Sequence, residues 1–248
     1  MFKKIFNEYI YLSTFGRIYK ALKLLDSKPD LTIPSQIALH AENNPNSVAI
    51  YFEGDEITFG DLIKRANKYA QWFVDNKMPR GGVVALMMEN RPEFLACWIG
   101  ITQVGGTVAL INTNLIGQPL DYSLNISHAK HLILGKELYD NFSSTSDKSK
   151  NDFSIWVQGK GKELNHYNDI DQALKTLPDK KPEINYEVNN TDSALYIYTS
   201  GTTGNPKAAT LSHKRLRLMM LGFKGASRPT RKDRIYNVLP LYHSAGGV

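Results

Sequence analysis

A stretch rich in glycine and hydroxyl side chains, YTSGTTGNPK, holds the residues best suited to chemistry in this sequence. Its glycines and hydroxyls are Thr199, Ser200, Gly201, Thr202, Thr203 and Gly204, and the cation Lys207 follows them. Glycines let the backbone approach a ligand closely, hydroxyls donate to oxygen atoms, and a lysine adds a charge-assisted contact. Phosphate groups require these donors. The sequence therefore predicts a phosphate-binding loop at residues 199–207.

Two common phosphate motifs do not match this stretch. A Walker A loop needs Gly-Lys-Ser/Thr, whereas Lys207 lies between Pro206 and Ala208. The GKG at 159–161 begins a dinucleotide pattern, but Leu164 occupies its third glycine position. A flexible surface loop is the remaining alternative, since Ser, Thr and Gly often form one. The expected order of strand, loop and basic helix favours phosphate binding.

Strand and helix patterns alternate along most of the chain, and these elements must position the loop. The predicted strands are 47–52, 56–59, 83–88, 107–111, 131–134, 153–157, 194–199 and 234–242, and the predicted helices are 35–43, 62–76, 92–104, 120–127 and a basic helix after Ser212. The polar run 143–151 predicts an exposed loop. Alternating strands and helices imply right-handed crossovers and a largely parallel sheet with helices on both faces. The predicted fold class is α/β.

Composition narrows the function classes. The chain has 248 residues and a net charge of +6, and residues 205–234 carry nine Lys or Arg against one acid. Few aromatic residues interrupt that basic run, which argues against single-stranded nucleic acid and favours a solvated helix face with some attraction for nucleotide or lipid. No apolar run reaches the length of a membrane span. The single Cys97 excludes an internal disulfide and fits a reducing, cytoplasmic setting.

The first 25 residues carry five basic residues and one acid. Apolar residues recur at helical spacing at Ile5, Tyr9, Leu12, Phe15, Tyr19 and Leu22. The pattern predicts a basic amphipathic helix within residues 1–30, ahead of a main domain at 31–248. Packing of the apolar stripe on that domain is the favoured interpretation, and a helix lying on a membrane surface is the alternative. Charges throughout the segment exclude a secretory signal.

The string YTSGTTGNPKAA resembles, nearly residue for residue, the signature loop of the acyl-adenylate-forming superfamily of AMP-binding enzymes. The block MMENRPEFLACWIGITQV resembles a second conserved segment of that superfamily. INTN at 111–114 and LPLYHSAGG at 239–247 are similar to its fatty acid transport protein and very-long-chain acyl-CoA synthetase branch. The resemblance implies the incomplete N-terminal part of the large adenylate-forming domain, with the C-terminal domain absent.

By this resemblance, the 199–204 loop and Lys207 would hold the phosphates of ATP. Tyr242 and His243 match the position that the family places beside the substrate carboxylate and acyl tunnel, and His243 would be the catalytic residue. From the residues alone, an ordinary hydrogen-bonded core histidine is the favoured interpretation of His243. The resemblance implies ATP, Mg²⁺ and CoA as cofactors. No metal ligand is assigned, because His128 and His131 lack a third partner at suitable spacing.

The expected function is ATP-dependent activation of a long-chain or very-long-chain fatty acid to an acyl-adenylate and then to acyl-CoA. The 248-residue chain itself is expected to be a truncated ligase with weak or no turnover. A nucleotide-binding module or a membrane-associated module, each without ligase activity, is the alternative. The expected partner is the fatty acid, with peripheral contact at the inner face of a membrane as a second expectation. Neither nucleic acid nor a protein partner is expected.

Overall fold

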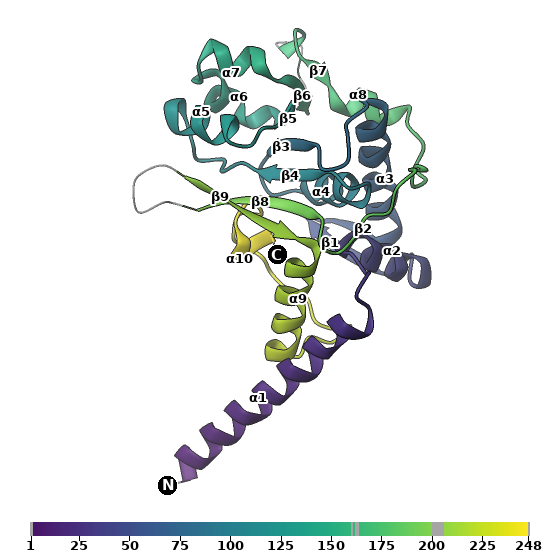
Figure 1. Cartoon of the computed structure of the whole chain (residues 1–248), viewed down its shortest axis with the longest axis vertical. Helices are drawn as coiled ribbons and strands as arrows, with labels where there is room; N and C mark the ends of the chain where they lie inside the picture. Colours follow the sequence, from purple (N-terminus) through teal and green to yellow (C-terminus); the bar gives the residue numbers. More distant parts are fainter. Residues whose placement is uncertain (1, 160, 162–163, 200–205, 248) are drawn as a thin grey trace.

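A seven-stranded sheet forms the centre of the computed structural model, and helices lie on both of its faces (Figure 1). The structure describes residues 2–159, 161, 164–199 and 206–247. The strand order is β7-β6-β5-β3-β4-β8-β9, and every neighbouring pair is parallel except β8 and β9. A separate antiparallel hairpin consists of β1 and β2. The predicted α/β fold with a largely parallel sheet is confirmed.

The elements of the described chain have these bounds. The helices are α1 (Phe2–Ser27), α2 (Ile33–Asn43), α3 (Phe59–Asp75), α4 (Pro92–Gln103), α5 (Gly117–Asn125), the 3₁₀ helix η1 (Lys136–Leu138), α6 (Tyr139–Ser143), α7 (Asp147–Asp152), α8 (Ile170–Lys175), α9 (His213–Ser227) and α10 (Ser244–Gly247). The strands are β1 (Val48–Phe52), β2 (Asp55–Thr58), β3 (Val83–Met87), β4 (Thr107–Leu110), β5 (His131–Gly135), β6 (Ser154–Gln158), β7 (Asn168–Asp169), β8 (Ser193–Thr199) and β9 (Lys207–Ser212).

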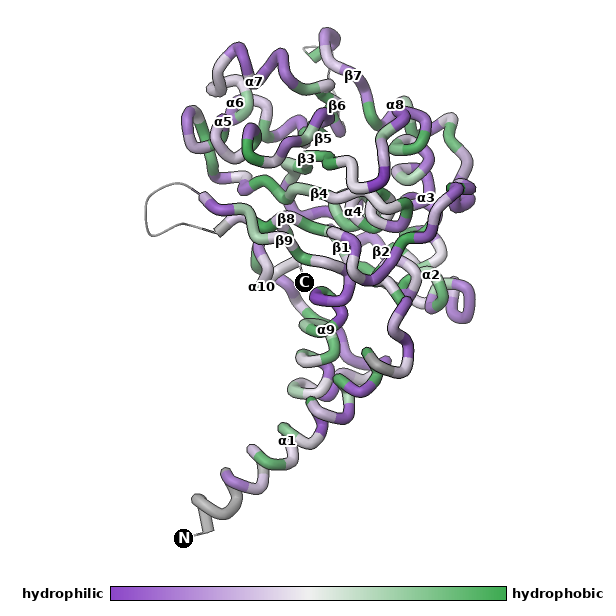
Figure 2. Tube along the Cα trace, viewed as in Figure 1, coloured by the Kyte–Doolittle hydropathy of each residue, from purple (hydrophilic) through white to green (hydrophobic). Residues whose placement is uncertain are grey.

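The central strands are buried on both faces, which explains their uninterrupted apolar sequences. In β3, Val84 and Leu86 join the core cluster that includes α3 and α4, while Ala85 and Met87 join the cluster beneath α5 and α6. Successive side chains of a strand point to opposite faces, so one short apolar run fills two cores. Figure 2 shows this concentration of apolar residues through the middle of the sheet. The sheet therefore provides a rigid frame for the loops at its edge.

Three local predictions are corrected by the structure. The polar run 143–151 is not a loop throughout, because Ser146 caps α7 by accepting from the Ser149 amide. Helix α2 begins at Ile33 rather than at residue 35, and Thr32 is its N-cap residue. The stretch 234–242 joins neither sheet, so the predicted strand there is wrong. A strand needs a hydrogen-bonded neighbour, which its alternating apolar sequence alone does not supply.

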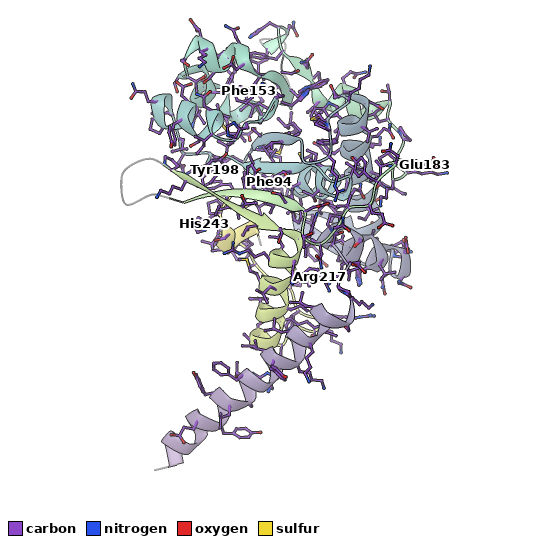
Figure 3. All side chains as sticks on the ribbon, viewed as in Figure 1. Phe94, Phe153, Glu183, Tyr198, Arg217 and His243 are labelled. Carbon is purple, nitrogen blue, oxygen red and sulfur yellow. The ribbon has the colours of Figure 1, made fainter. Side chains whose placement is uncertain are left out.

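Helix α1 packs against α9, which is almost 200 residues away in the sequence (Figures 1 and 3). The Arg217 guanidinium is only 2% exposed, and its Nη1 donates to the carbonyl of Lys28 at 2.8 Å. In return, Arg17 Nε donates to the carbonyl of Gly225 at 3.2 Å. Each arginine thus supplies donors to carbonyls near the end of the other helix. Arg217 is therefore buried rather than part of the predicted solvated basic face.

Most of the described residues in the predicted apolar stripe of α1 do not pack on the main domain, although Leu22 is half-buried. Tyr9, Leu12, Phe15 and Tyr19 are 69%, 69%, 54% and 65% exposed. The half-buried face of this helix instead includes Thr14, Arg17, Ile18 and Ala21. The N-terminal half of α1 extends beyond the end of α9 (Figure 1). None of the described helices is both long enough and apolar enough to cross a membrane.

Candidate functional site

Three loops with polar side chains leave the same edge of the parallel sheet. Strands β3, β4 and β8 are parallel neighbours, so the segments that follow Met87, Leu110 and Thr199 all lie at their carboxyl ends. The chain moves from β3 to β4 on one side and then returns across β3 to β5, so the strand order reverses between β3 and β5. In open α/β sheets, ligands bind in the crevice outside such carboxyl ends. This edge is therefore the candidate site.

The two described flanks of the predicted phosphate loop lie at this edge, at the end of β8 and the start of β9. Thr199 is the last residue of β8, and Lys207 is the first residue of β9. These two residues face each other in the register of the antiparallel pair, and the Lys207 side chain is exposed. Ser200, Gly201, Thr202, Thr203 and Gly204 lie outside the described residues. The structure thus locates the two flanks of the predicted loop.

The segment after the loop differs from the predicted order of strand, loop and helix. Residues Lys207–Ser212 return antiparallel to β8 as the unpredicted strand β9, whereas the basic helix α9 starts at His213, directly after Ser212 as predicted. Ala208 and Ala209 have good helix propensity, but pairing with the otherwise open edge of β8 overrides that local preference. Thr199 and Lys207 are consequently paired at one end of the antiparallel β8–β9 pair, and α9 begins at the opposite end of that pair.

The Tyr242 hydroxyl contacts the segment that follows β4, so the INTN and LPLYH motifs lie together. The Asn114 side chain donates its Nδ2 to the Tyr242 hydroxyl at 3.0 Å. Asn112 supports Asn114, because its Oδ1 accepts from the Asn114 amide at 2.9 Å. Tyr242 is half-buried and packs against the core cluster that contains Ile197 of β8. The INTN and LPLYH motifs therefore form one surface at the end of β4, the strand that pairs with β8.

His243 is exposed and is held by its own turn rather than by a core contact. Its amide donates to the Pro240 carbonyl at 3.1 Å, and its Nδ1 accepts from the Ala245 amide at 3.3 Å. A neutral ring that accepts at Nδ1 carries its proton on Nε2. The side chain can therefore present an Nε2–H donor to a ligand. The interpretation of His243 as a buried core histidine is not supported (Figure 3).

Asn90 was not given a role from the sequence, although it directly contacts the segment that leads to Tyr242. Its Oδ1 accepts from the Leu241 amide at 2.8 Å, and its Nδ2 donates to the Leu239 carbonyl at 2.9 Å. The available signal was its place just after a buried strand, the same place that Asn114 has after β4. A single polar residue at a strand end carries no periodic pattern, so propensity rules pass over it.

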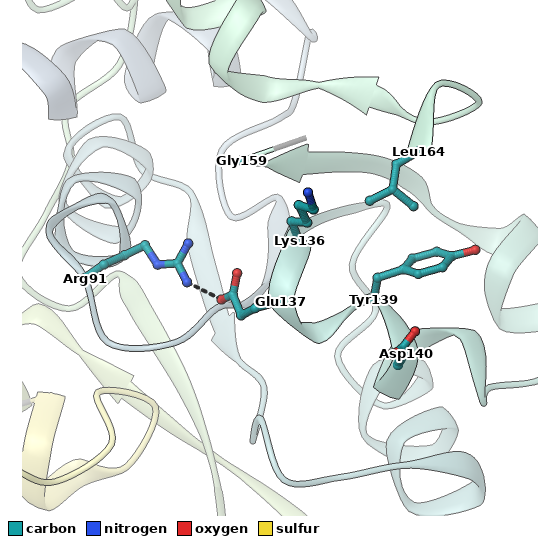
Figure 4. Close-up of a pocket in the computed structure, with 7 residues that line it drawn as sticks. All are labelled: Arg91, Lys136, Glu137, Tyr139, Asp140, Gly159 and Leu164. Atoms are coloured by element: carbon teal, nitrogen blue, oxygen red, sulfur yellow. Dashed lines mark ion pairs between the residues drawn. The ribbon is translucent and has the colours of Figure 1, made fainter. Parts of the chain in front are cut away.

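A cavity of about 530 Å³ lies along the same edge, at the carboxyl ends of β3, β5 and β6 (Figure 4). Arg91, Glu137, Tyr139 and Gly159 are among its lining residues. Arg91 forms an ion pair with Glu137, and its Nη1 also donates to the Gln158 Oε1 at 2.6 Å. The ion pair of Arg91 with Glu137 therefore connects the segment after β3 to the segment after β5, the two strands between which the strand order reverses. It holds the β3 and β5 loops together beside the candidate site.

His213 is the first residue of α9, directly after β9, and is fully buried. Burial lowers the pKa of its imidazole to about 4, against opposing effects of the Asp192 carboxylate and the Thr102 carbonyl. Neither ring nitrogen reaches a hydrogen-bond partner with good geometry within the described part of the chain. The ring is therefore neutral at pH 7 and forms part of the support for the hairpin.

Other ionisable residues do not assemble into a metal centre in the described ranges, where no group of three or more His, Cys, Asp or Glu side chains could hold an ion. His131, considered above with His128, instead accepts from the Trp156 Nε1 at its Nδ1, 3.2 Å away. Burial lowers the pKa of His131, which keeps the ring in the neutral form that this bond needs. Cys97 is buried within α4, and burial raises the pKa of its thiol.

Comparison with known proteins finds one family model, described as AMP-binding enzyme, that matches residues 37–248. Long-chain fatty acid transport protein 1 of Rattus norvegicus is 35% identical over 223 residues, which cover 88% of this chain and 34% of the relative. The medium/long-chain-fatty-acid–CoA ligase FadD6 of Mycobacterium tuberculosis is 29% identical over 198 residues, covering 79% of this chain and 32% of the relative. The chain thus spans about a third of the length of these relatives.

Among solved structures, a long-chain-fatty-acid-CoA ligase (FadD1) from Archaeoglobus fulgidus has a similar fold. Its TM-score is 0.77 at 24% sequence identity, and the match covers 88% of this chain and 44% of that structure. Identity at this level supports the fold and not a shared substrate.

Proposed function

The chain belongs to the AMP-binding enzyme family, and on that premise we propose that it takes part in ATP-dependent activation of a long-chain or very-long-chain fatty acid. The proposed product is an acyl-adenylate, which CoA then converts to acyl-CoA. Similarity to a long-chain fatty acid transport protein and to a medium/long-chain-fatty-acid–CoA ligase supports this substrate class. The observation that carries the proposal is the meeting of Asn114 and Tyr242 beside the β8–β9 hairpin.

The chemistry explains why a phosphate-binding hairpin and a carboxylate site need to be neighbours. A carboxylate oxygen of the fatty acid attacks the α-phosphorus of ATP, and the bond from that phosphorus to pyrophosphate breaks. Negative charge develops on the phosphate oxygens, and preorganised donors and cations stabilise it. We assign this role to residues 199–204 and Lys207. In the second step, the sulfur of CoA attacks the acyl carbonyl, and AMP leaves.

We assign Tyr242 and His243 to the fatty-acid carboxylate. The Asn114 amide fixes the Tyr242 hydroxyl, and the Ala245 amide fixes the tautomer of His243. The Nε2–H of His243 would then donate to a carboxylate oxygen and orient the other oxygen toward phosphorus. The exposed position of this ring suits a contact with substrate. His243 is the proposed catalytic residue.

Mg²⁺ and CoA are the further groups that the family implies, and neither is assigned to particular residues. Mg²⁺, when bound, neutralises charge on the phosphates of ATP. The described residues offer no cluster of acidic ligands for such an ion. We also propose that the 248-residue chain alone forms acyl-CoA weakly or not at all. A purified chain that converts palmitate, ATP and CoA to palmitoyl-CoA at an ordinary ligase rate would contradict this.

ATP binding is tested first by thermal unfolding of the purified chain. ATP with Mg²⁺ should raise the melting temperature, because a ligand that binds only the folded state stabilises it. Lys207→Ala should reduce that shift. Lys214→Ala is the matched control, since Lys214 is also exposed but lies at the start of α9. An equal shift in all three proteins would exclude Lys207 from the site.

A nucleotide-binding module without ligase activity is the rival to be separated from this proposal. Both ideas predict an ATP-dependent shift in melting temperature, but only fatty-acid activation predicts a further shift when palmitate is added with ATP, a readout that needs no turnover. His243→Ala should abolish that further shift and leave the ATP shift in place. ATP binding with no additional effect of palmitate would favour the module.

Peripheral contact with the inner face of a membrane is a second proposal, and the surface of α1 supports it. Tyr9, Tyr11, Leu12, Phe15 and Tyr19 are exposed on this helix, and so are the basic residues Lys20 and Lys23. Aromatic rings insert at the headgroup level of a bilayer, and basic residues attract anionic lipid. A cytoplasmic protein with such a helix would bind the cytoplasmic leaflet.

Vesicle flotation tests this second proposal. Binding to phosphatidylserine-containing vesicles should exceed binding to pure phosphatidylcholine, and the pair Phe15→Ser and Tyr19→Ser should weaken it. Tyr122→Ser is the control, because Tyr122 is an exposed aromatic residue on α5. If Phe15 and Tyr19 mediate self-association in sedimentation and no vesicle binding is found, the surface is a contact between copies.

A further inference from the structure

We infer that Asn90 is a positioning residue that holds the backbone before Tyr242 and His243 against the carboxyl end of β3. This inference depends on the proposed function for the identity of the ligand, but its geometry is independent of that ligand. The Asn90 amide group bonds at both ends to one short segment, through Oδ1 to the Leu241 amide at 2.8 Å and through Nδ2 to the Leu239 carbonyl at 2.9 Å.

The pattern is the one that a residue of a parallel strand presents to its neighbour. Such a residue donates to the carbonyl before, and accepts from the amide after, the residue that lies opposite. Here the residue opposite is Pro240, which has no N–H of its own to satisfy. A primary amide carries a donor and an acceptor in one plane, as the peptide group does. The Asn90 side chain therefore extends the hydrogen-bonding pattern of a parallel strand beyond the end of β3.

The residues that lead into this segment are mostly exposed, so packing does little to fix their position. Ile235, Tyr236 and Val238 are 70%, 90% and 69% exposed, whereas Leu241 is 9% exposed and joins the main core cluster. The chain thus passes from an exposed stretch to a buried residue at the point where Asn90 bonds to it. Two hydrogen bonds at this point set both the direction and the register of the residues that follow.

The proposed substrate contacts come directly after the Asn90 bonds. Tyr242 and His243 are the next two residues, and the turn that orients the His243 ring starts at Pro240, whose carbonyl accepts from the His243 amide. A displacement at Leu241 would therefore move the Tyr242 hydroxyl away from Asn114 as well as the imidazole. A misplacement of about 1 Å costs an enzyme up to about a hundredfold in rate. Asn90 acts through this backbone and does not touch the substrate itself.

Neighbouring groups explain why an asparagine is needed at this position. Aspartate would keep the acceptor for the Leu241 amide but would place an oxygen against the Leu239 carbonyl in place of a donor. Alanine would remove both bonds. The adjacent Arg91 cannot substitute, because it already pairs with Glu137 and Gln158. Asn90→Asp thus removes one of the two hydrogen bonds, and Asn90→Ala removes both.

Amide hydrogen exchange of the whole chain tests the inference without any ligand. In Asn90→Ala, exchange at the amides of Leu241 and His243 should rise by up to about tenfold, the effect expected for loss of a hydrogen bond. Asn90→Asp should keep more protection at Leu241 than Asn90→Ala does. Asn43→Ala is the matched control, since Asn43 also donates its Nδ2 to a backbone carbonyl, that of Leu39 at 2.7 Å. It should leave the 239–247 amides unchanged.

Palmitate binding to the same proteins then separates the positioning role from the proposed substrate. Faster exchange confined to 239–247 together with weaker palmitate binding in Asn90→Ala supports the inference. The same local exchange with no palmitate binding by wild type keeps the positioning role and counts against the proposed substrate. Unchanged exchange at Leu241 and His243 overturns the inference. Faster exchange across the whole sheet also overturns it, because Asn90 would then be a general stabilising residue.

Discussion

Replacement of the buried His213 should remove most of the pH dependence of folding just below neutral pH. An unfolded chain holds histidine with a pKa near 6.5, whereas burial lowers the pKa of His213 to about 4. Between these values the unfolded chain takes up a proton that the folded chain does not. The stability that a neutral His213 contributes is therefore complete above pH 6.5 and is lost progressively as the pH falls toward 4.

The size of the effect follows from this difference in pKa. One pKa unit corresponds to about 1.36 kcal/mol, so the full fall to pH 4 amounts to roughly 3 kcal/mol, and the part between pH 7 and pH 5 to about 2 kcal/mol. His213→Leu should remove this part from the free energy of unfolding. At pH 7 the variant should be as stable as wild type or more so, since the ring nitrogens of His213 are buried without partners among the described residues.

Urea unfolding at pH 7, 6 and 5 measures this difference. His131, whose pKa burial also lowers, contributes a slope of the same sign in both proteins, so the comparison of variant with wild type isolates His213. His128→Asn is the control, because His128 is exposed and its φ of +56° suits asparagine. If His213→Leu and wild type lose the same free energy between pH 7 and pH 5, the buried neutral histidine is not the source.

Two further predictions concern the packing of α1 on α9. Gly225→Ala should cost about 1–3 kcal/mol, because the added Cβ would lie 2.6 Å from the Ile18 Cα, whereas Gly222→Ala has open space and should gain about 0.5–1 kcal/mol; thermal unfolding measures both. Arg217→Met should cost about 1–3 kcal/mol and make α1 more sensitive to protease, because the Lys28 carbonyl at the end of α1 loses the donor that the buried Arg217 supplies.

Each of these predictions has an outcome that contradicts it. Equal effects of Gly225→Ala and Gly222→Ala would mean that α1 and α9 are not in close contact. A gain in stability from Arg217→Met would mean that the cost of burying a guanidinium exceeds the value of its hydrogen bonds. Protease sensitivity that stays unchanged in both Gly225→Ala and Arg217→Met would place α1 off α9 in solution.

The central sheet could be predicted from the sequence because its signal is local. Strands β3, β4, β5 and β8 are short apolar runs between turn residues, and burial on both faces requires such runs. The helix α4 was equally clear, since Pro92 marks its first turn. The family resemblance added what periodicity lacks, namely that the loop after β8 and the segment at Tyr242 belong together.

The remaining features depend on contacts between distant residues. Strand β9 exists because β8 offers a free edge, and no local pattern in 207–212 distinguishes that outcome from a helix. Apolar spacing in α1 predicted a helix but not the face that packs, because Arg217 and Gly225 of α9 determine that face. The role of Asn90 could not be predicted from the sequence, because its hydrogen-bond partner Leu241 lies about 150 residues later in the chain.

The pairing of α1 with α9 has a consequence for synthesis of the chain on the ribosome. Arg17 is made 208 residues before its acceptor, Gly225. At roughly 5–20 residues per second, that interval lasts about 10–40 s. Helix α1 is thus synthesised well before the helix on which it docks, and its aromatic side chains are available to chaperones or to lipid throughout that delay.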